Sequence, residues 1–207
     1  MNILVVAAHP DDEVLGCGGT IAQHTAAGDE VQVIFMAAGR DDIKSRTMAL
    51  DAARVMKTQN PLFLGHEDQK LDTYPLLRLT QHIERVADRF LPDVVLTHSS
   101  ADLNKDHRIV HEATLTAFRP IGDSPDILCF EVTSSTEWGE RAFHPNYFVD
   151  IHDHIDVLHK ALQCYGEEMR PFPHPRSYAG VSHQYYFRGA QAGLHAAEAF
   201  EVVRIIR

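Results

Sequence analysis

The sequence predicts a single α/β domain with a doubly wound, mostly parallel sheet and helices on both faces. Apolar segments of strand length alternate with amphipathic segments of helical length along the chain of 207 residues. The first apolar run, residues 3–8, contains no polar side chain, which is typical of a strand buried on both faces. No linker, repeat or low-complexity tract interrupts the pattern, so we expect one domain over residues 1–207.

The elements follow one another in near-strict alternation. The expected strands are residues 3–8, 30–37, 62–64, 93–97, 127–131, 147–150 and 199–206. The expected helices are residues 13–27, 43–57, 75–90, 107–118, 151–165 and 177–194, with loops at 39–42, 65–70, 99–106 and 166–176. Gly16, Gly18 and Gly19 are expected to let the first helix approach the sheet closely.

The formal net charge of −10 argues against nonspecific nucleic-acid binding, which needs a basic surface, and against docking on an anionic membrane. No apolar segment is long enough to span a bilayer, and the opening run lacks the basic region and cleavage site of a signal peptide. We therefore expect a cytoplasmic protein. The cysteines, Cys17, Cys129 and Cys164, are widely spaced and odd in number, so they are expected to be free thiols.

The first strand ends at an unusual polar sequence, His9-Pro10-Asp11-Asp12-Glu13. Three consecutive carboxylates repel one another, and a bound divalent cation would remove that cost. His9 and Asp12 offer a nitrogen and an oxygen of the kinds that zinc takes, which leaves Asp11 to act as a base. The alternative is that Asp12 and Glu13 stabilise the first turn of the following helix. That alternative does not explain the histidine or the proline.

A second polar segment is predicted at the same edge of the sheet. In a doubly wound, Rossmann-like order the first and fourth strands are neighbours, and the ligand crevice opens at their carboxyl ends. His98 ends the fourth strand and His107 opens the next helix, so His107 is the expected third zinc ligand. His111, one turn deeper, is either an outer partner of the site or a packed histidine. Asp106 either caps this helix or orients His107.

These two motifs resemble those of the PIG-L/LmbE family of zinc-dependent N-deacetylases. The resemblance rests on His9-Pro10-Asp11-Asp12-Glu13 and Asp106-His107, and it extends to the order and spacing of elements over nearly the whole chain. It implies one Zn²⁺ per chain, held by His9, Asp12 and His107, with Asp11 as general base. It also implies hydrolytic removal of the N-acetyl group from an N-acetylated amino sugar or glycoconjugate.

The resemblance also implies further site residues. Arg46 falls where the family places a substrate-binding arginine, and Asp68 falls near a sugar-binding acid; the alternatives are a solvated helix residue and a loop acid. Many relatives carry a histidine three residues before the last zinc ligand, where this chain has Asn104. Asn104 could stabilise an oxyanion but is a poor proton donor, so either His98 or Asp11 would protonate the leaving amine.

The segment 166–176 contains three prolines, which exclude a helix or a central strand. Long irregular segments in a compact domain are usually functional or disordered. We expect this one to border the substrate cleft, with His174 and Arg176 as donors to sugar hydroxyls or to an anionic aglycone. An ordinary surface loop is the alternative.

Two other classes of function stay open. Gly16-Cys17-Gly18-Gly19 suggests a dinucleotide-dependent oxidoreductase, but these glycines come late after the strand and lack the G-x-G-x-x-G spacing. A noncatalytic sugar- or nucleotide-binding protein of the same fold would be expected to lack one of the four motif positions, and all four are intact. The expected partner is a small N-acetylated sugar or glycoconjugate, and a homo-oligomer is an open alternative to a monomer.

Overall fold

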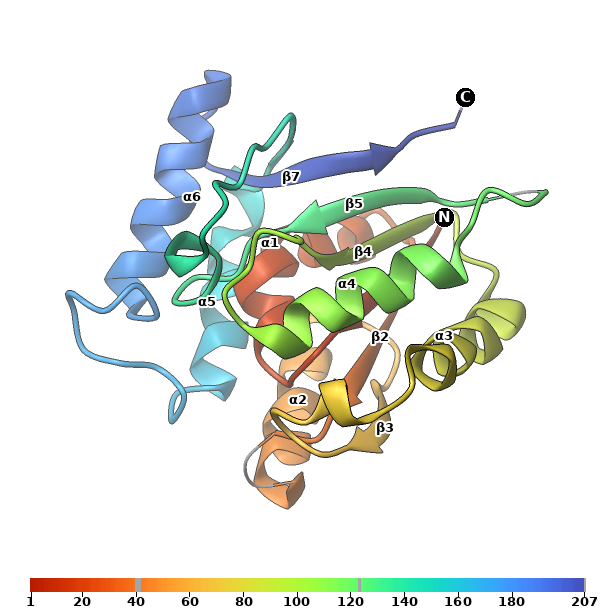
Figure 1. The fold of residues 1–207 in the computed structure, drawn as a ribbon. Coiled ribbons are helices and arrows are strands. Elements are labelled where there is room, and N and C mark those ends of the chain that lie inside the picture. Colours follow the sequence, from red (N-terminus) through yellow and green to blue (C-terminus); the bar gives the residue numbers. More distant parts are fainter. Residues whose placement is uncertain (40–41, 123, 207) are drawn as a thin grey trace.

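The computed structural model describes residues 1–39, 42–122 and 124–206, which form an α/β domain around one seven-stranded sheet (Figure 1). The strands are β1 (Asn2–Ala7), β2 (Glu30–Ala37), β3 (Leu62–His66), β4 (Val94–His98), β5 (Asp126–Phe130), β6 (Tyr147–Asp150) and β7 (Ala197–Arg204). They lie in the order β3-β2-β1-β4-β5-β7-β6. Strand β7 runs antiparallel to β5 and β6, whereas the other pairs are parallel. The predicted doubly wound, mostly parallel sheet is confirmed.

Helices cover both faces of this sheet (Figure 1). The helices are α1 (Asp12–Ala26), α2 (Asp42–Met56), α3 (Leu76–Phe90), α4 (Lys105–Ala117), α5 (Ile155–Cys164) and α6 (Tyr178–Ala192), with short 3₁₀ turns η1 (Leu71–Thr73), η2 (Thr136–Trp138) and η3 (His152–His154). Leu4 and Val6 of β1 pack in a core with α3 and α4, whereas Ile3 and Val5 pack in a second core with α1, α2 and α5. This two-sided burial explains why the first run of the sequence is apolar throughout.

Helix α1 lies unusually close to the sheet and is broken near its middle. A Cβ added to Gly16 would lie 2.3 Å from the Phe130 ring, which confirms the predicted close approach. Cys17 has non-helical dihedrals (φ −152°, ψ 25°), so the helix restarts after it. The Glu198 carboxylate, from β7, accepts the N–H groups of Gly19 and Thr20, both at 2.7 Å, at this restart. A buried acid from the far end of the chain thus caps an internal helix terminus.

Some expectations differ from the structure in detail. The predicted helix 151–165 begins as η3, because the N–H of Ile151 is still bonded to the Ala196 carbonyl beside the sheet. The last strand lies two residues earlier than expected. Arg40 and Asp41, of the predicted loop 39–42, lie outside the described residues. The three cysteines are free thiols, as expected. Within the described ranges, no helix has the length and apolar character needed to cross a membrane.

The pairing of β1 with β4 brings the two polar motifs together. Val6 lies opposite Thr97 in the parallel register, so the His9 loop and His98 leave the sheet at the same edge. This is the topological switch point at which ligands bind in open α/β sheets.

Candidate active site

His9, Asp12 and His107 converge at the carboxyl edge of the sheet. His9 Nδ1 lies 3.4 Å from one oxygen of Asp12, and His107 Nε2 lies 3.3 Å from the other. One ligand atom from each of the three residues lies within 4.8 Å of the others. His9 comes from the loop after β1, Asp12 opens α1, and His107 lies in the first turn of α4. Two imidazoles and one carboxylate form a donor set that fits a catalytic zinc ion with three protein ligands.

Each imidazole is backed by a further carboxylate. His9 Nε2 lies 3.1 Å from Oδ2 of Asp106 and 3.2 Å from Oδ1 of Asp68. His107 Nδ1 lies 3.1 Å from Oδ2 of Asp102, at ion-pair distance but not aligned as a hydrogen bond. Outer carboxylates of this kind orient the histidines that bind a metal. The inward nitrogens, Nδ1 of His9 and Nε2 of His107, are therefore the ones left for an ion.

Two other groups of described residues could also surround a cation: His98, Asp102 and His107, and His9, Asp68 and Asp106. Their carboxylates are already engaged. Asp102 accepts hydrogen bonds from one backbone N–H and two hydroxyl groups, and Asp106 accepts two backbone N–H groups. Asp12 accepts one hydrogen bond, from the N–H of His9 at 2.8 Å. Asp12 thus keeps more lone pairs for a metal, which favours the set that includes it.

Asp106 differs from both of its expected roles. Asn104 is the N-cap of α4, and its side-chain oxygen accepts the N–H of Asp106 at 2.9 Å. The Asp106 carboxylate instead binds the N–H groups of Gln69 and Leu71 and reaches His9. The predictions that Asp106 caps the helix or orients His107 are therefore wrong. Asn104 fills the cap, which leaves its amide nitrogen as the group for the predicted oxyanion contact.

The electrostatics of the cluster favour positive charge beside Asp12. Burial acts to lower the pKa of His107, but the nearby charges of Asp12 and Asp102 outweigh burial and raise that pKa to about 9. Burial acts to raise the pKa of Asp12, but the charge and hydrogen bonding of the surrounding imidazoles hold it well below its ordinary value. Asp12 is therefore ionised, in the state that a metal ligand requires.

Asp11 stands beside this cluster with one carboxylate oxygen free. Its φ of 113° is uncommon outside glycine, and Glu13 secures the backbone by accepting the N–H of Asp11 at 3.0 Å. Glu13 in turn accepts the Tyr165 hydroxyl at 2.7 Å. Oδ2 of Asp11 accepts a 2.6 Å hydrogen bond from Arg176, whereas no donor among the described residues reaches Oδ1. Burial raises the pKa of Asp11 to about 7, which suits a general base near neutral pH.

His98 lies fully buried beneath the cluster, with its ring stacked on His107 at 4.0 Å between centroids. His98 Nε2 accepts the N–H of Ala8 at 2.9 Å, which assigns the proton to Nδ1. Burial lowers its pKa well below the ordinary value, so the ring is neutral. A neutral imidazole with no exposed surface has no path to a substrate. The placement of His98 argues against its predicted role as general acid.

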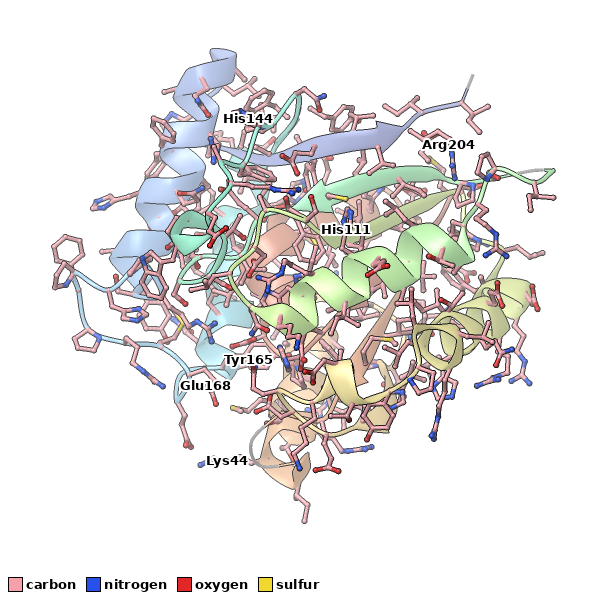
Figure 2. The ribbon with its side chains drawn as sticks, viewed as in Figure 1. Lys44, His111, His144, Tyr165, Glu168 and Arg204 are labelled. Carbon is pink, nitrogen blue, oxygen red and sulfur yellow. The ribbon has the colours of Figure 1, made fainter. Side chains whose placement is uncertain are left out.

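His111 is a packed histidine of α4, one of its two predicted alternatives. Its Nδ1–H donates to the His98 carbonyl at 2.8 Å, and the ring lies against Cys129 (Figure 2). Burial raises the pKa of the Cys129 thiol above its ordinary range. Neither residue belongs to the groups of described residues that could hold a metal ion.

Of the predicted substrate residues, Asp68 and Arg46 lie on the β3 side. Asp68 is the more exposed of the two acids behind His9, with 23% of its side chain accessible. Arg46 stacks over the ring of Phe63, with 4.7 Å between the guanidinium carbon and the ring centroid. The stack places the Arg46 guanidinium of α2 over a ring of β3.

The segment 166–176 is irregular, as predicted, and ends where α6 begins. His174 lies edge-on to Trp138, with 5.7 Å between ring centroids, and its Nδ1 accepts the N–H of Arg176 at 3.1 Å. Arg176 reaches Asp11 itself, a contact that the sequence did not indicate. The expectation that this segment borders the site agrees with that contact.

Sequence reasoning did not single out Asp102, which backs His107, or the exposed Trp138, which lies beside His174. Asp102 looked like an ordinary acid of the loop 99–106, and its role depends on Ser135 and Thr136, whose hydroxyls hold its carboxylate. Trp138, the single tryptophan of the chain, is 50% exposed on η2. An exposed lone tryptophan after a strand was the available signal for Trp138, whereas no signal singled out Asp102.

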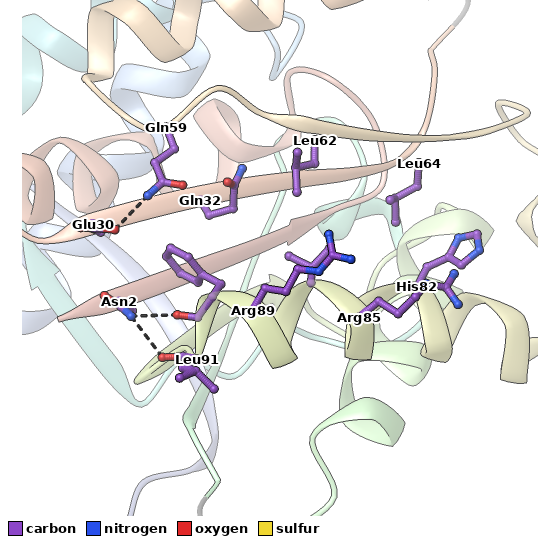
Figure 3. A pocket seen from close by; sticks show the side chains of 12 residues that line it. Asn2, Glu30, Gln32, Gln59, Leu62, Leu64, His82, Arg85, Arg89 and Leu91 are labelled. Atoms are coloured by element: carbon purple, nitrogen blue, oxygen red, sulfur yellow. Dashed lines mark hydrogen bonds between the residues drawn. The ribbon is translucent and has the colours of Figure 1, made fainter.

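A separate groove lies away from this site, between α3 and the strands β2 and β3 (Figure 3). It has a volume of about 690 Å³, and its walls include Gln32, Leu62, Arg85 and Arg89. None of the clustered histidines or acids lines it. This groove is therefore separate from the clustered histidines and acids at the carboxyl edge of the sheet.

The fold and the His–Asp–His cluster beside a buried aspartate fit a metal-dependent hydrolase. The chain belongs to the PIG-L family, because the family model, described as GlcNAc-PI de-N-acetylase, matches residues 4–118. This match spans β1 to α4 and contains the three predicted ligands and Asp11. It ends before the segment that supplies Arg176.

Two similar proteins are described as deacetylases, and a third has a similar fold but is described as a hydratase. The chain is 28% identical over 159 residues to the uncharacterized deacetylase YaiS of Escherichia coli K12, covering 72% of this chain and 82% of that protein. The N,N'-diacetylchitobiose deacetylase of Pyrococcus horikoshii has a TM-score of 0.80 at 20% identity, covering 97% of this chain and 83% of its own. GalB, the 4-carboxy-2-hydroxymuconate hydratase of Pseudomonas putida KT2440, has a TM-score of 0.79 at 24% identity, covering 100% and 99%. These two structures show the shared fold, which serves more than one reaction.

Proposed function

We propose that this protein hydrolyses the N-acetyl group of an amino sugar or glycoconjugate, with one zinc ion held by His9, Asp12 and His107. The observation that supports this most is the position of Asp11. It is a buried carboxylate with one oxygen that no donor among the described residues reaches, beside a zinc-type ligand set, in a chain of a de-N-acetylase family. A cytoplasmic location and an oligomer of identical chains stay predictions.

The comparisons support the substrate class. The family model is described by an N-acetylglucosamine conjugate, and one structural neighbour acts on N,N'-diacetylchitobiose. An acetamido sugar is common to both, so an N-acetylglucosamine-type unit is the proposed substrate. Arg46, Asp68 and His174 are proposed to contact this sugar, and the amide nitrogen of Asn104 is proposed as the oxyanion donor.

The proposed chemistry uses Asp11 twice. A bound zinc ion supplies polarisation of the amide carbonyl and acidification of a water molecule. Oδ1 of Asp11 takes a proton from the attacking water as the water oxygen bonds to the carbonyl carbon. The protonated carboxyl then returns the proton to the amide nitrogen as the C–N bond breaks, which yields acetic acid and a free amine; the acid then ionises to acetate. The buried position of His98 favours Asp11 for both transfers.

The test is acetate release from N-acetylglucosamine, N,N'-diacetylchitobiose and N-acetylglucosaminyl-inositol, with zinc content measured in parallel. Asp11→Asn should retain zinc and lose roughly 10²–10⁴-fold in kcat, because a base is removed and no ligand is lost. Asp12→Asn should lose zinc, and the exposed Asp72→Asn should match the wild type. A wild-type enzyme that releases no acetate but hydrates 4-carboxy-2-hydroxymuconate, an unsaturated tricarboxylate, would replace this proposal with a GalB-like function.

A further inference from the structure

Arg176 links the proline-rich segment 166–176 to the buried carboxylate of Asp11. Its Nη1 donates to Oδ2 of Asp11 at 2.6 Å, and its Nε donates to the hydroxyl of Ser134 at 3.0 Å. The guanidinium therefore spans two partners that come from different parts of the chain. The side chain is mostly buried, with 20% of its surface exposed.

This contact constrains one Asp11 oxygen and leaves the other for chemistry. Charge-assisted hydrogen bonds at a buried site are short and strong, so rotation of the carboxylate would break a costly interaction. The backbone of Asp11 is also fixed, because Glu13 holds its N–H. With backbone and Oδ2 both held, Oδ1 has one orientation.

The second partner of Arg176, Ser134, lies in a loop that is itself held by hydrogen bonds. Ser134 has a φ of 68°, and its N–H donates to a carboxylate oxygen of Glu137 at 2.7 Å. This loop after β5 also holds Asp102, the acid behind His107, through Ser135 and Thr136. The same loop thus supports the partner of a ligand and the partner of Asp11.

We propose that Arg176 is a positioning residue for the general base, which holds Asp11 so that Oδ1 faces the scissile amide. The proposal rests on the proposed function of this site. It gives Arg176 a role other than the expected contact with substrate. Arg176 lies beyond the part of the chain that the family model matches, and 165 residues separate it from Asp11.

The kinetic test compares Arg176→Ala with Arg170→Ala, which removes the same charge from the same segment. Arg170 bonds to local carbonyls and does not contact Asp11. Arg176→Ala should lower kcat on the order of 100-fold with KM little changed, because a misplaced catalytic group costs about this much. Guanidinium added far below denaturing concentrations should restore part of the loss in Arg176→Ala. An increase in KM with unchanged kcat would assign Arg176 to substrate binding instead.

A double-mutant cycle with Asp11→Asn gives a second test. If Arg176 acts through Asp11, Arg176→Ala should cause little further loss of kcat in the Asp11→Asn background. Full additivity of the two losses would overturn the proposal. If Arg176→Ala does not fold, Arg176→Lys is measured in its place. A single ammonium does not reproduce the fork between Asp11 and Ser134, so kcat should still fall.

A third measurement does not depend on activity. Amide exchange at Arg176 and Ser177 should accelerate in Asp11→Asn and in Arg176→Lys, because each change loosens the segment at its inner anchor. Unchanged exchange in both variants would show that the contact does not hold the segment, and would overturn the proposal. A wild-type protein that is inactive on every N-acetylated sugar would refute the proposed function. The Arg176–Asp11 contact would then be tested by the amide-exchange measurement alone.

Discussion

At the scale of single residues, the site is built from histidines that each lie between an inner carboxylate and one or two outer ones. His107 lies between Asp12 and Asp102, and His9 lies between Asp12 on one side and Asp106 and Asp68 on the other. The inner carboxylate serves as a ligand and the outer ones serve as orienting groups. Removal of an inner group should therefore cost more metal affinity than removal of an outer one.

Removing a ligand is the more severe of these changes. His9→Ala and His107→Ala should each lose the metal, because two protein ligands hold zinc much more weakly than three. The fold should persist, since the cores on both faces of the sheet are untouched. Elemental analysis and circular dichroism check both statements, and full zinc content in the two variants would rule the site out.

Asp102→Asn tests the outer group. We expect zinc affinity to fall by roughly 10–100-fold, because the amide holds the His107 ring less firmly than the carboxylate does. Chelator competition measures the change. Asp72→Asn is the matched control, since Asp72 is an exposed acid that pairs with Lys105. Equal affinities in the two variants would contradict an orienting role.

At the scale of elements, helix α1 both carries a proposed metal ligand and packs closely on its neighbours. Its first turn carries Asp12, Gly16 allows close contact with Phe130 of β5, Gly18 allows close contact with Leu158 of α5, and Glu198 caps its second half. A shift of this helix would move a ligand, so its packing is tied to function.

Gly16→Ala and Gly18→Ala test this packing with the same chemical change. The new methyl at residue 16 would meet the Phe130 ring at 2.3 Å, whereas at residue 18 it would meet a terminal methyl of Leu158 at 2.7 Å. Overpacking against a fixed ring should cost about 1–3 kcal/mol. The Leu158 methyl can rotate away, so Gly18→Ala should stay within about 1 kcal/mol of the wild type. Urea unfolding measures both, and equal losses would contradict the argument.

The Glu198 cap predicts a pH dependence of stability. Burial raises the pKa of Glu198 from its ordinary value of 4.5 to about 7, against the opposing effect of its hydrogen bonds to Thr20 and Gly19. A raised carboxyl pKa favours the folded state below about 4.5, and this contribution is lost as pH rises through about 7. The full change is on the order of 3 kcal/mol.

Glu198→Gln isolates this contribution, because glutamine does not titrate. The stability advantage of the wild type over Glu198→Gln should be larger at pH 5 than at pH 8. Urea unfolding of both proteins at the two pH values measures it. A difference that is constant or that grows with pH would show that Glu198 is ionised in the folded protein throughout.

At the scale of the whole molecule, the candidate site joins parts of the chain that are distant in sequence. The ligands lie on the loops and helices after β1 and β4, the acids behind them come from the segments after β3 and β4, and the groups that hold Asp102 and Asp11 come from after β5. A bound ion would thus bridge neighbouring strand–helix units, and its binding energy would add to the stability of the fold.

Metal removal should therefore lower the melting temperature. A ligand at about 100 times its Kd stabilises a protein by about 2.7 kcal/mol, which for a chain of this size corresponds to roughly 5–10 °C. Treatment of the zinc-loaded wild type with a chelator should show this shift in calorimetry. His107→Ala should show no shift, because it lacks a ligand. An equal shift in both proteins would place the stabilising metal elsewhere.

The sequence by itself determined the sheet and the location of the site. The apolar run of residues 3–8 predicted a strand buried on both faces, and the alternation of segments predicted the parallel order that makes β1 and β4 neighbours. These features depend on periodicity and composition, which are local properties of a chain. His9, Asp12 and His107 were predicted because they lie at the ends of such elements.

The tertiary structure alone decided which side chains support that site. Asp102 backs His107, Asn104 rather than Asp106 caps α4, His98 is buried, and Arg176 holds Asp11. Each outcome depends on the direction of one side chain and on a partner from another segment. Local spacing predicts where an element begins and ends, but it carries no information on contacts across 165 residues. Such contacts are fixed only when the sheet and its helices pack together.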